Sequence, residues 1–582
     1  MTELDAQPTT DELSKAIDRL SNGKAPGSDG IPPEVLKSGK SALLQPLHTL
    51  LCLCWEQGYV PQDMRDANIV TLYKIKGDRS DCNNYRGISL LSIVGKVFAR
   101  VALNRLQVLA SRVYPESQCG FRAARSTVDM VFSVRQLQEK CLEQQMPLYI
   151  AFIDLTKAFD LVSRGGLFKL LKKIGCPPHL HALVSSFHED MQSTVTYNGS
   201  TSKPFKVSSG VKQGCVLAPT LFGIFFSMLL QYAFKDCNEG VFIRTRSDGK
   251  LFNIARLRAK TKVSRVLIRE MLFADDAALV SHTEAGLQQL VDLFSHACKE
   301  FGLTISIKKT NILAQKAAGP PTISIDGSNL EVVDDFKYLG STISSSLTID
   351  TEINSRIAKA SATMAKLSQR VWNNLHLTTN TKMKVYQACV LSILLYASES
   401  WTTYARHEKK LNTFHLRCLR RILHIKWQDK VSNSEVLERA KTKTLYSILR
   451  ERRLRWLGHV KRMEPGRIPK DLLYSELEEG TRPTGRPKLR FKDVCKRDLK
   501  LCDISCDQWE HYAVDRDDWR HAVKQGVKRA EEAWLETTTA KRARHKERKQ
   551  RQIAQPPTQH LCLTCGRDCH SRLGLHSHSR AC

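Results

Sequence analysis

The sequence predicts an α+β protein that becomes helical and basic beyond its middle and finishes in a small Cys/His-rich module. Three observations support this. Residues 148–338 mix β-branched apolar runs with helical patterns, which favours an α+β core over repeating strand–helix units. Beyond residue 349 apolar side chains recur at helical spacing among many cations. Cysteines and histidines crowd together at the C-terminal end.

The elements before this core alternate between helix and strand. Residues 11–20 carry an amphipathic helical pattern, and a turn-rich loop follows at 24–30. Apolar helical patterns alternate with short strands over residues 43–109, where 67–73 is the clearest strand. This part of the chain is therefore expected to add both helices and sheet to the core.

The C-terminal part is predicted to be helical, with two breaks. Residues 383–396 and 411–425 have apolar side chains at helical spacing. Residues 480–487 are rich in Pro, Gly and Arg, which predicts an interruption. The basic run 541–551 is expected to stay solvated or to lie on nucleic acid. Residues 555–558 have the composition of a linker.

Composition indicates a globular protein with a polyanionic partner. Hydrophobic residues make up 42% and charged residues 25% of 582 residues, which excludes wholesale disorder and a fibrous repeat. The 89 Lys and Arg outnumber the 59 Asp and Glu, giving a formal net charge of +30. Such a surplus favours a nucleic-acid partner, because neutralised phosphates release counterions. A merely soluble basic protein is the alternative.

We expect neither a membrane span nor a secretory leader. The most apolar run, residues 215–230, is interrupted by Pro219, Thr220 and Ser227 and is too short to span a bilayer. The acidic N-terminal end has no apolar core, so it does not resemble a signal peptide. Eighteen cysteines without a leader favour reduced thiols.

Aspartates stand where two apolar strand patterns end. Asp154 follows the run 148–153, and Asp275 and Asp276 lie between two apolar runs of hairpin length. Adjacent acids among buried strands repel each other and are costly to desolvate, and divalent cations remove that penalty. Two magnesium ions are what an in-line phosphoryl displacement needs. A polar turn of an exposed hairpin is the alternative for Asp275 and Asp276 alone.

These segments resemble reverse transcriptases of the non-LTR (LINE-type) retrotransposons. The motif Phe273-Ala274-Asp275-Asp276 is similar to the third palm motif of that family, residues 154–160 to the first and residues 210–222 to the second. Further blocks follow the order of the family, at residues 84–91, 118–122, 302–310 and 336–340. Seven blocks in order make the resemblance specific. Residues 394–401 and 455–460 resemble the region that follows the polymerase in such elements.

The resemblance implies a right-hand polymerase fold of fingers, palm and thumb. The implied domains are an N-terminal extension of the fingers (1–60), fingers and palm (61–345), a helical thumb (346–430), a basic helical region with a linker (431–554) and a zinc finger (555–582). The resemblance covers roughly residues 20–345, so the chain begins almost at the polymerase, and we expect the upstream endonuclease of such elements to be absent. The chain would then be a shortened copy or a fragment of a longer product.

The resemblance also assigns roles at the site. Asp154 and Asp275 would bind two Mg²⁺ ions, with Asp276 as the third carboxylate. Phe159 would lie under the sugar and exclude a ribose 2′-hydroxyl, with core packing as the alternative. Asp160 is expected to cap the following turn. The remaining nucleotide contacts are expected from Gln213 and Gly214 and from the basic residues Arg86, Lys96, Arg122 and Lys309. The primer grip is expected at Tyr338, Leu339 and Gly340.

The C-terminal cysteines and histidines have the spacing of a zinc finger. Cys562, Cys565, His578 and Cys582 give the pattern Cys-x2-Cys-x12-His-x3-Cys, which suits tetrahedral Zn²⁺. The layout fits a ββα finger in which Cys582 replaces the last histidine. Rival ligands are His576 and Cys569. Beside the basic run, such a finger is expected to grip DNA or RNA.

The resulting hypothesis is an RNA-directed DNA polymerase that uses an RNA template, a DNA primer from nicked target DNA and deoxynucleotides. Nuclear residence with a cytoplasmic ribonucleoprotein stage is expected. The alternatives are an inactive, element-derived nucleic-acid-binding protein, and an RNA polymerase of the same fold. Phe159 argues against the RNA polymerase, because a ring at that position excludes ribonucleotides.

Overall fold

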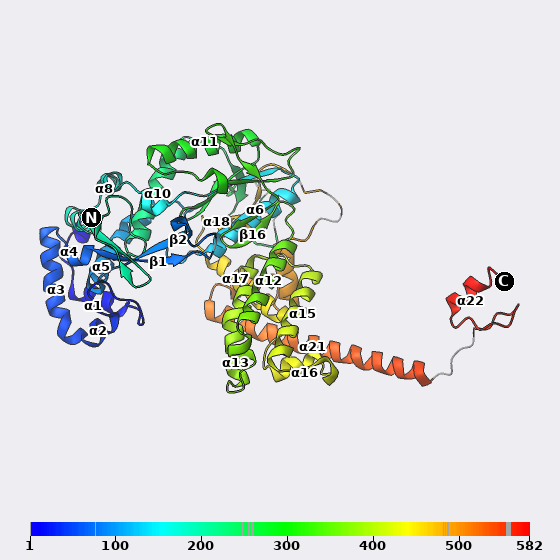
Figure 1. Ribbon diagram of the computed structural model, residues 1–582. Coiled ribbons are helices and arrows are strands. Elements are labelled where there is room, and N and C mark those ends of the chain that lie inside the picture. Colours follow the sequence, from blue (N-terminus) through cyan, green and yellow to red (C-terminus); the bar gives the residue numbers. More distant parts are fainter. Residues whose placement is uncertain are drawn as a thin grey trace. The chain divides into compact units, whose positions relative to one another are not determined.

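The computed structural model describes residues 2–75, 77–246, 248–253, 257, 261–480, 482–483, 485, 488–554 and 560–582 (Figure 1). The chain forms two compact units. Unit 1 comprises Met1–Ala362, Val390–His407 and His459–Cys495, and unit 2 comprises Thr363–Cys389, Glu408–Gly458 and Lys496–Cys582. The chain therefore returns twice to unit 1. The domain bounds expected from the sequence stay a prediction, and the expected linker 555–558 lies outside the described residues.

The central sheet of unit 1 has five strands in the order β14-β11-β3-β10-β9. Their bounds are β3 Leu148–Ile153, β9 Glu270–Phe273, β10 Asp276–Ser281, β11 Asn311–Gln315 and β14 Glu331–Val332. Strand β3 reads as a continuous apolar run because both of its faces are buried. Ala151 and Ile153 join one hydrophobic core, and Ile150 and Phe152 join another. This buried strand ends directly at Asp154.

Three helices cover the two faces of this sheet. Helices α10 (Ala218–Phe234) and α11 (Glu284–Glu300) contribute to the core that contains Ile153. Helix α6 (Thr127–Glu143) contributes to the core that contains Phe152. Helix α10 is almost wholly buried, which explains its long apolar run. The mixed sheet with helices on both faces confirms the predicted α+β class.

A second five-stranded sheet carries the N-terminal part of the site. It follows the order β2-β1-β4-β5, with β6 paired to β4, and β1 runs parallel to β4. Strand β1 spans Ala67–Tyr73, as predicted, and β2 spans Tyr85–Leu90. Helix α1 (Thr10–Asp18) agrees with the predicted helix and begins at a capping box between Thr9 and Glu12.

The remaining elements of unit 1 complete its two sheets and their cover. The other helices are α2 Pro33–Ser38, α3 Lys40–Gln57, α4 Gln62–Arg65, α5 Ile93–Val113, α7 Ala158–Leu161, α8 Arg164–Lys173, α9 Pro178–Ser186, α14 Ser392–Leu394 and α18 Ile468–Tyr474. The other strands are β4 Gln192–Tyr197, β5 Ser200–Thr201, β6 Phe205–Lys206, β7 Val241–Thr245, β8 Ser264–Ile268, β12 Ser324–Ile325, β13 Ser328–Asn329, β15 Asp335–Tyr338, β16 Ser341–Ser344 and β17 Glu476–Leu477.

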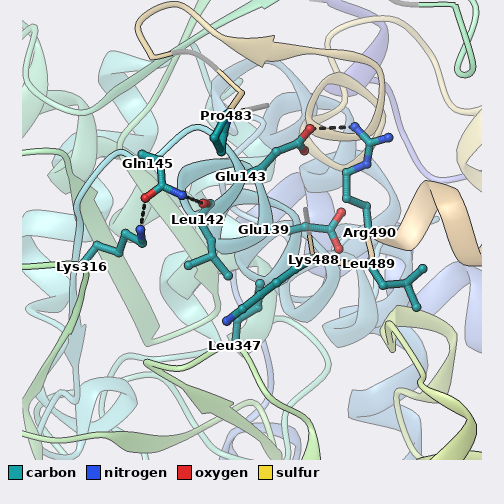
Figure 2. A pocket seen from close by; sticks show the side chains of 10 residues that line it. All are labelled: Glu139, Leu142, Glu143, Gln145, Lys316, Leu347, Pro483, Lys488, Leu489 and Arg490. Atoms are coloured by element: carbon teal, nitrogen blue, oxygen red, sulfur yellow. Dashed lines mark hydrogen bonds and ion pairs between the residues drawn. The ribbon is translucent and has the colours of Figure 1, made fainter. Parts of the chain in front are cut away.

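The segment His459–Cys495 belongs to the body of unit 1. Strand β17 adds to β7, and Arg490 pairs with Glu143 of α6 at 2.7 Å. This ion pair borders a cavity of about 360 Å³, which Figure 2 shows together with the Gln145–Lys316 contact. None of the predicted site residues lines that cavity. The ion pair and the added strand make this segment structural.

Unit 2 is helical, as the spacing of its apolar residues predicts. Helix α12 (Asp350–Lys366) lies mostly in unit 1 and ends in unit 2. The other helices with residues in unit 2 are α13 Thr379–Val385, α15 Ala405–Ile422, α16 Asn433–Arg439, α17 Leu445–Arg462, α19 Phe491–Leu501, α20 Trp509–Tyr512, α21 Arg516–Ala554 and α22 Arg572–His578. A π-helical stretch, Tyr386–Leu391, follows α13. The predicted helix at 411–425 ends at Ile422.

Two buried contacts hold the core of unit 2. Arg453 and Asp498 form an ion pair at 2.7 Å in which each side chain is almost fully buried. The indole of Trp519 donates to the carbonyl of Leu454 at 2.9 Å and lies where a side chain at Gly458 would stand. The basic run 541–551 forms the exposed end of α21. Within the described part of the chain, no helix has the length and apolarity of a bilayer span.

Candidate active site

The three predicted aspartates converge at one end of the central sheet. Strands β3 and β10 are antiparallel, with Ala277 opposite Ile153, so the next pair in this register sets Asp276 opposite Asp154. Asp275 lies in the tight turn between β9 and β10, where Ala274 has a φ of +59°. All three side chains are at least partly exposed. Carboxylates separated by more than 100 residues of sequence thus face one space.

The electrostatics of this cluster are those of crowded acids. Burial, with the charges of Asp275 and Asp154, raises the pKa of Asp276 to about 6. Burial also raises the pKa of Asp275; the charge of Asp154 adds to this, while Arg86 and Lys309 oppose it. The Lys309 ammonium lies 2.8 Å from Asp154 Oδ2. A divalent cation binds hard carboxylate oxygens and removes the repulsion between crowded acids, so the three residues fit Mg²⁺.

The turn at Ala274 and Asp275, called the catalytic turn below, is held by Gln118. The sequence indicates Gln118 only as part of the block 118–122. Gln118 is fully buried. Its Oε1 accepts from the backbone N–H of Ala274 at 2.9 Å, and its Nε2 donates to the Ala274 carbonyl at 3.0 Å. Gly120 lies against the same turn, because a Cβ there would stand 2.1 Å from the Ala274 nitrogen. This loop therefore fixes the backbone beside Asp275.

Phe159 lies in an aromatic row next to the aspartates. Its ring stacks on Phe222 of α10 with centroids 4.3 Å apart and meets Phe121 edge-on at 6.2 Å. The ring is half-buried, so one part packs on the core and another part stays accessible. Core packing and contact with a sugar are therefore compatible here. Asp160 lies in the short helix α7, and its side chain is exposed.

The glycine-containing loop at 210–217 packs against β2. Gly214 has a φ of +117°, and a Cβ there would stand 2.4 Å from the Ser89 carbonyl oxygen. The Gln213 carbonyl accepts from the Ser89 N–H at 2.9 Å. Gly214 is thus required by the approach of two backbones, and its nucleotide contact stays a prediction. The Gln213 side chain is half-buried.

The four predicted basic residues have different surroundings. Arg86 is exposed on β2, and its charge acts on Asp275. Burial lowers the pKa of Lys96, and the charges of Asp29 and Cys215 oppose that shift. Arg122 donates to the carbonyls of Pro115 and Gln118 at 2.7 and 2.9 Å, so its guanidinium holds the loop that carries Gln118. The nucleotide or template contacts expected of Arg86, Lys96 and Arg122 stay predictions, as does the role of Lys309 as a proton donor to pyrophosphate.

The predicted primer grip is a fixed hairpin turn. Strands β15 and β16 pair Tyr338 with Ser341, and Leu339 and Gly340 between them both have positive φ, the geometry of a tight two-residue turn. The Tyr396 hydroxyl donates to the Leu339 carbonyl at 2.8 Å, and Arg356 binds the Gly340 carbonyl. The hydroxyl of buried Tyr338 donates to the Met271 carbonyl at 2.9 Å, which links the turn to β9.

The C-terminal module gathers the four predicted metal ligands. Ligand atoms of Cys562, Cys565, His578 and Cys582 all lie within 4.8 Å of one another, and the rivals Cys569 and His576 do not belong to this group. Helix α22 supplies His578, and Leu561 bridges Asp568 in a minimal strand pair. Backbone N–H groups of Cys565 and Thr564 lower the pKa of Cys562 to about 6. This donor set fits Zn²⁺.

Residues 75–343 match the family model described as "Reverse transcriptase (RNA-dependent DNA polymerase)". These residues form a reverse transcriptase domain. Among curated proteins, the RNA-directed DNA polymerase from mobile element jockey of Drosophila melanogaster is 26% identical over 430 residues, 72% of this chain and 44% of that protein. The jockey protein of Drosophila funebris is 29% identical over 432 residues, 73% of this chain and 45% of that protein.

The match and these relatives confirm the resemblance to the reverse transcriptases of mobile elements. The chain spans less than half the length of the two jockey proteins. Among solved structures, an apo telomerase from Candida tropicalis truncated from its C-terminal domain overlays loosely, with a TM-score of 0.34 and 14% identity over 55% of this chain and 60% of that one. The aspartates, Gln118 and the 336–340 turn all lie within the reverse transcriptase domain.

Proposed function

We propose that this protein is an RNA-directed DNA polymerase of a non-LTR retroelement, which adds deoxynucleotides to a primer 3′-hydroxyl on an RNA template. The observation that carries the proposal is the meeting of Asp154, Asp275 and Asp276 within a reverse transcriptase domain. The primer would come from nicked target DNA. Nuclear residence, with a cytoplasmic ribonucleoprotein stage, belongs to the same proposal because the target is chromosomal DNA.

In this proposal Asp154 and Asp275 hold two Mg²⁺ ions and Asp276 supports them. Bound there, the ions supply activation of the attacking oxygen and stabilisation of the leaving oxygen. The residues of the chain orient the reaction. The turn of Tyr338, Leu339 and Gly340 holds the primer end, and Gln213, Gly214, Arg86, Lys96 and Arg122 contact the nucleotide or the template. Lys309, whose ammonium already pairs with Asp154, donates a proton to the leaving pyrophosphate.

Phe159 selects deoxynucleotides in the same proposal. Its ring is half-buried on Phe222 and cannot retreat into the core without giving up that stacked arrangement. A 2′-hydroxyl on the incoming sugar would collide with such a ring, so ribonucleotides are excluded sterically. An RNA polymerase of the same fold would instead need a polar partner for the hydroxyl.

In the same proposal, the C-terminal module with bound Zn²⁺ and the exposed end of α21 together bind nucleic acid. Residues 541–551 contain seven Lys and Arg against one Glu, and all of them are exposed. Replacing Lys541, Lys546 and Lys549 with Gln in the full chain should weaken binding to duplex. The slope of log affinity against log salt should fall by up to about 0.9 for each phosphate that the variant no longer neutralises. Unchanged affinity and slope would show that this region does not bind nucleic acid.

Primer extension tests the polymerase directly. Purified protein is given poly(rA), an oligo(dT) primer, labelled dTTP and Mg²⁺. Extension is expected, and it should vanish in Asp275→Ala while template binding is kept. Asp160→Ala is the matched control, because this exposed aspartate of the same segment lies outside the proposed metal site, and it should extend normally. Template binding without any extension by the unmutated chain would instead support the inactive nucleic-acid-binding protein.

A further inference from the structure

Phe121 combines exposure with a backbone conformation that large side chains rarely adopt. Its φ is +57°, and the residue is 51% exposed although it directly follows the buried segment 117–120. Positive φ is unusual for a bulky residue and persists only where the surroundings impose it. An exposed aromatic held in this way at the edge of an active site calls for a functional explanation.

The surroundings of Phe121 impose this conformation from both sides. Gly120, before it, lies so close to the Ala274 backbone that no side chain fits there. Arg122, after it, is held by hydrogen bonds to the carbonyls of Pro115 and Gln118. The backbone of Phe121 is therefore held close to the turn that carries Asp275.

The ring of Phe121 closes one end of an aromatic row. It meets Phe159 nearly at right angles, with centroids 6.2 Å apart, and lies 6.4 Å from the ring of Phe273. Phe159 in turn stacks on buried Phe222. Phe159 thus has two ring contacts, a stacked one with Phe222 of the core and an edge-on one with Phe121. Offset and edge-to-face contacts of this kind are directional.

We propose that Phe121 is a positioning residue for Phe159, and that it sets how strongly the polymerase rejects ribonucleotides. The inference rests on the proposed function, in which Phe159 excludes the 2′-hydroxyl. A steric barrier is only as effective as its resistance to displacement, because a ring that can rotate aside admits the larger sugar. Removing the Phe121 ring would leave Phe159 free to move on that side while Mg²⁺ binding at the aspartates stays intact.

The test compares dATP with ATP on an RNA template whose next base is uracil. Phe121→Ala should lower the ratio of kcat/KM for dATP to that for ATP by about twofold to tenfold, the range that one aromatic contact supplies. Phe121→Tyr should keep the wild-type ratio, because the ring remains. Phe159→Ala should lower the ratio further. Thermal unfolding checks that each variant is folded.

Tyr232→Ala is the matched control. Tyr232 is 53% exposed and also has two ring neighbours, His296 and Phe301, none of which belongs to the site. It should leave the ratio unchanged. A Phe121→Ala variant that slows both nucleotides equally, or keeps the wild-type ratio while Phe159→Ala lowers it, overturns the inference and leaves the proposed function standing. Absence of dATP extension by the wild type refutes the proposed function itself.

Discussion

Removing the Gln118 amide should slow nucleotide addition even under conditions in which the variant protein is fully folded. The substitution Gln118→Leu keeps the side chain of similar size and removes three hydrogen bonds. Two of them join Gln118 to the N–H and carbonyl of Ala274, at 2.9 and 3.0 Å, and the third joins it to the N–H of Gly120 at 2.8 Å. Both backbone segments would then have buried polar groups without partners.

The expected magnitudes follow from these three hydrogen bonds. An orphaned buried polar group costs about 1–3 kcal/mol, so three of them decrease the free energy of unfolding by at least about 3 kcal/mol. Relaxation that lets water in would displace the turn at Ala274 and with it the Asp275 carboxylate. A misplacement of about 1 Å at a reacting centre costs roughly 100-fold in rate. We therefore expect a decrease in kcat of about 100-fold at temperatures where the variant is folded.

The assay is single-nucleotide extension with a thermal melt on the same samples. Gln288→Leu is the control, because the Gln288 amide bridges the N–H and carbonyl of Ser324, each at 2.9 Å, in the same way. Gln288 holds β12, which carries no site residue, so this variant should lose stability and keep its kcat. If folded Gln118→Leu extends primers within about threefold of the wild type, the amide does not position the catalytic turn.

Acid stability, metal binding and the C-terminal segment each give another prediction. Burial and the charge of Lys212 lower the pKa of His188 to about 3, so the free energy of unfolding decreases as the pH falls below about 6.5. In His188→Leu, the decrease between pH 6.5 and 5 should be smaller by roughly 2 kcal/mol, as measured by urea unfolding. Cys582→Ser should release Zn²⁺ at least about tenfold more readily to a chelating dye, with unchanged primer extension. Arg467→Met leaves buried Asp129 without its ion-pair partner at 2.8 Å, so the full chain should be destabilised by about 3–5 kcal/mol, measured by denaturant unfolding.

The sequence predicted the parts of the site that are local. Asp154 directly follows an apolar strand and Asp275 lies in a hairpin turn, so the apolar runs beside them already indicated that carboxylates stand at the ends of strands. The strand 67–73 and the helix near residues 11–18 were predictable for the same reason. Local patterns indicate where a strand ends, and these carboxylates stand at such ends.

Contacts between residues that are distant in sequence could not be predicted in the same way. A buried glutamine such as Gln118 gives no pattern of its own, and its role arises only when the fold brings Ala274 beside it, 156 residues later. Arg122 is expected to contact nucleotide or template, and the fold adds a role that the sequence did not indicate, since its guanidinium binds two carbonyls of its own loop. The positive charge of a side chain indicates the class of group that it can bind, but only the fold determines which hydrogen-bond acceptor lies next to it.

The site also depends on residues that lie beyond the matched domain. The matched residues end at 343, but the Leu339 carbonyl accepts from Tyr396, and Asp129 pairs with Arg467. Strand β17, at Glu476–Leu477, completes a sheet with β7. Tyr396 and Arg356 bind the carbonyls of Leu339 and Gly340, so the turn that we propose as the primer grip is fixed by segments outside the matched residues. Unit 1 is therefore assembled from three stretches of chain, and the matched residues are one part of a larger folding unit.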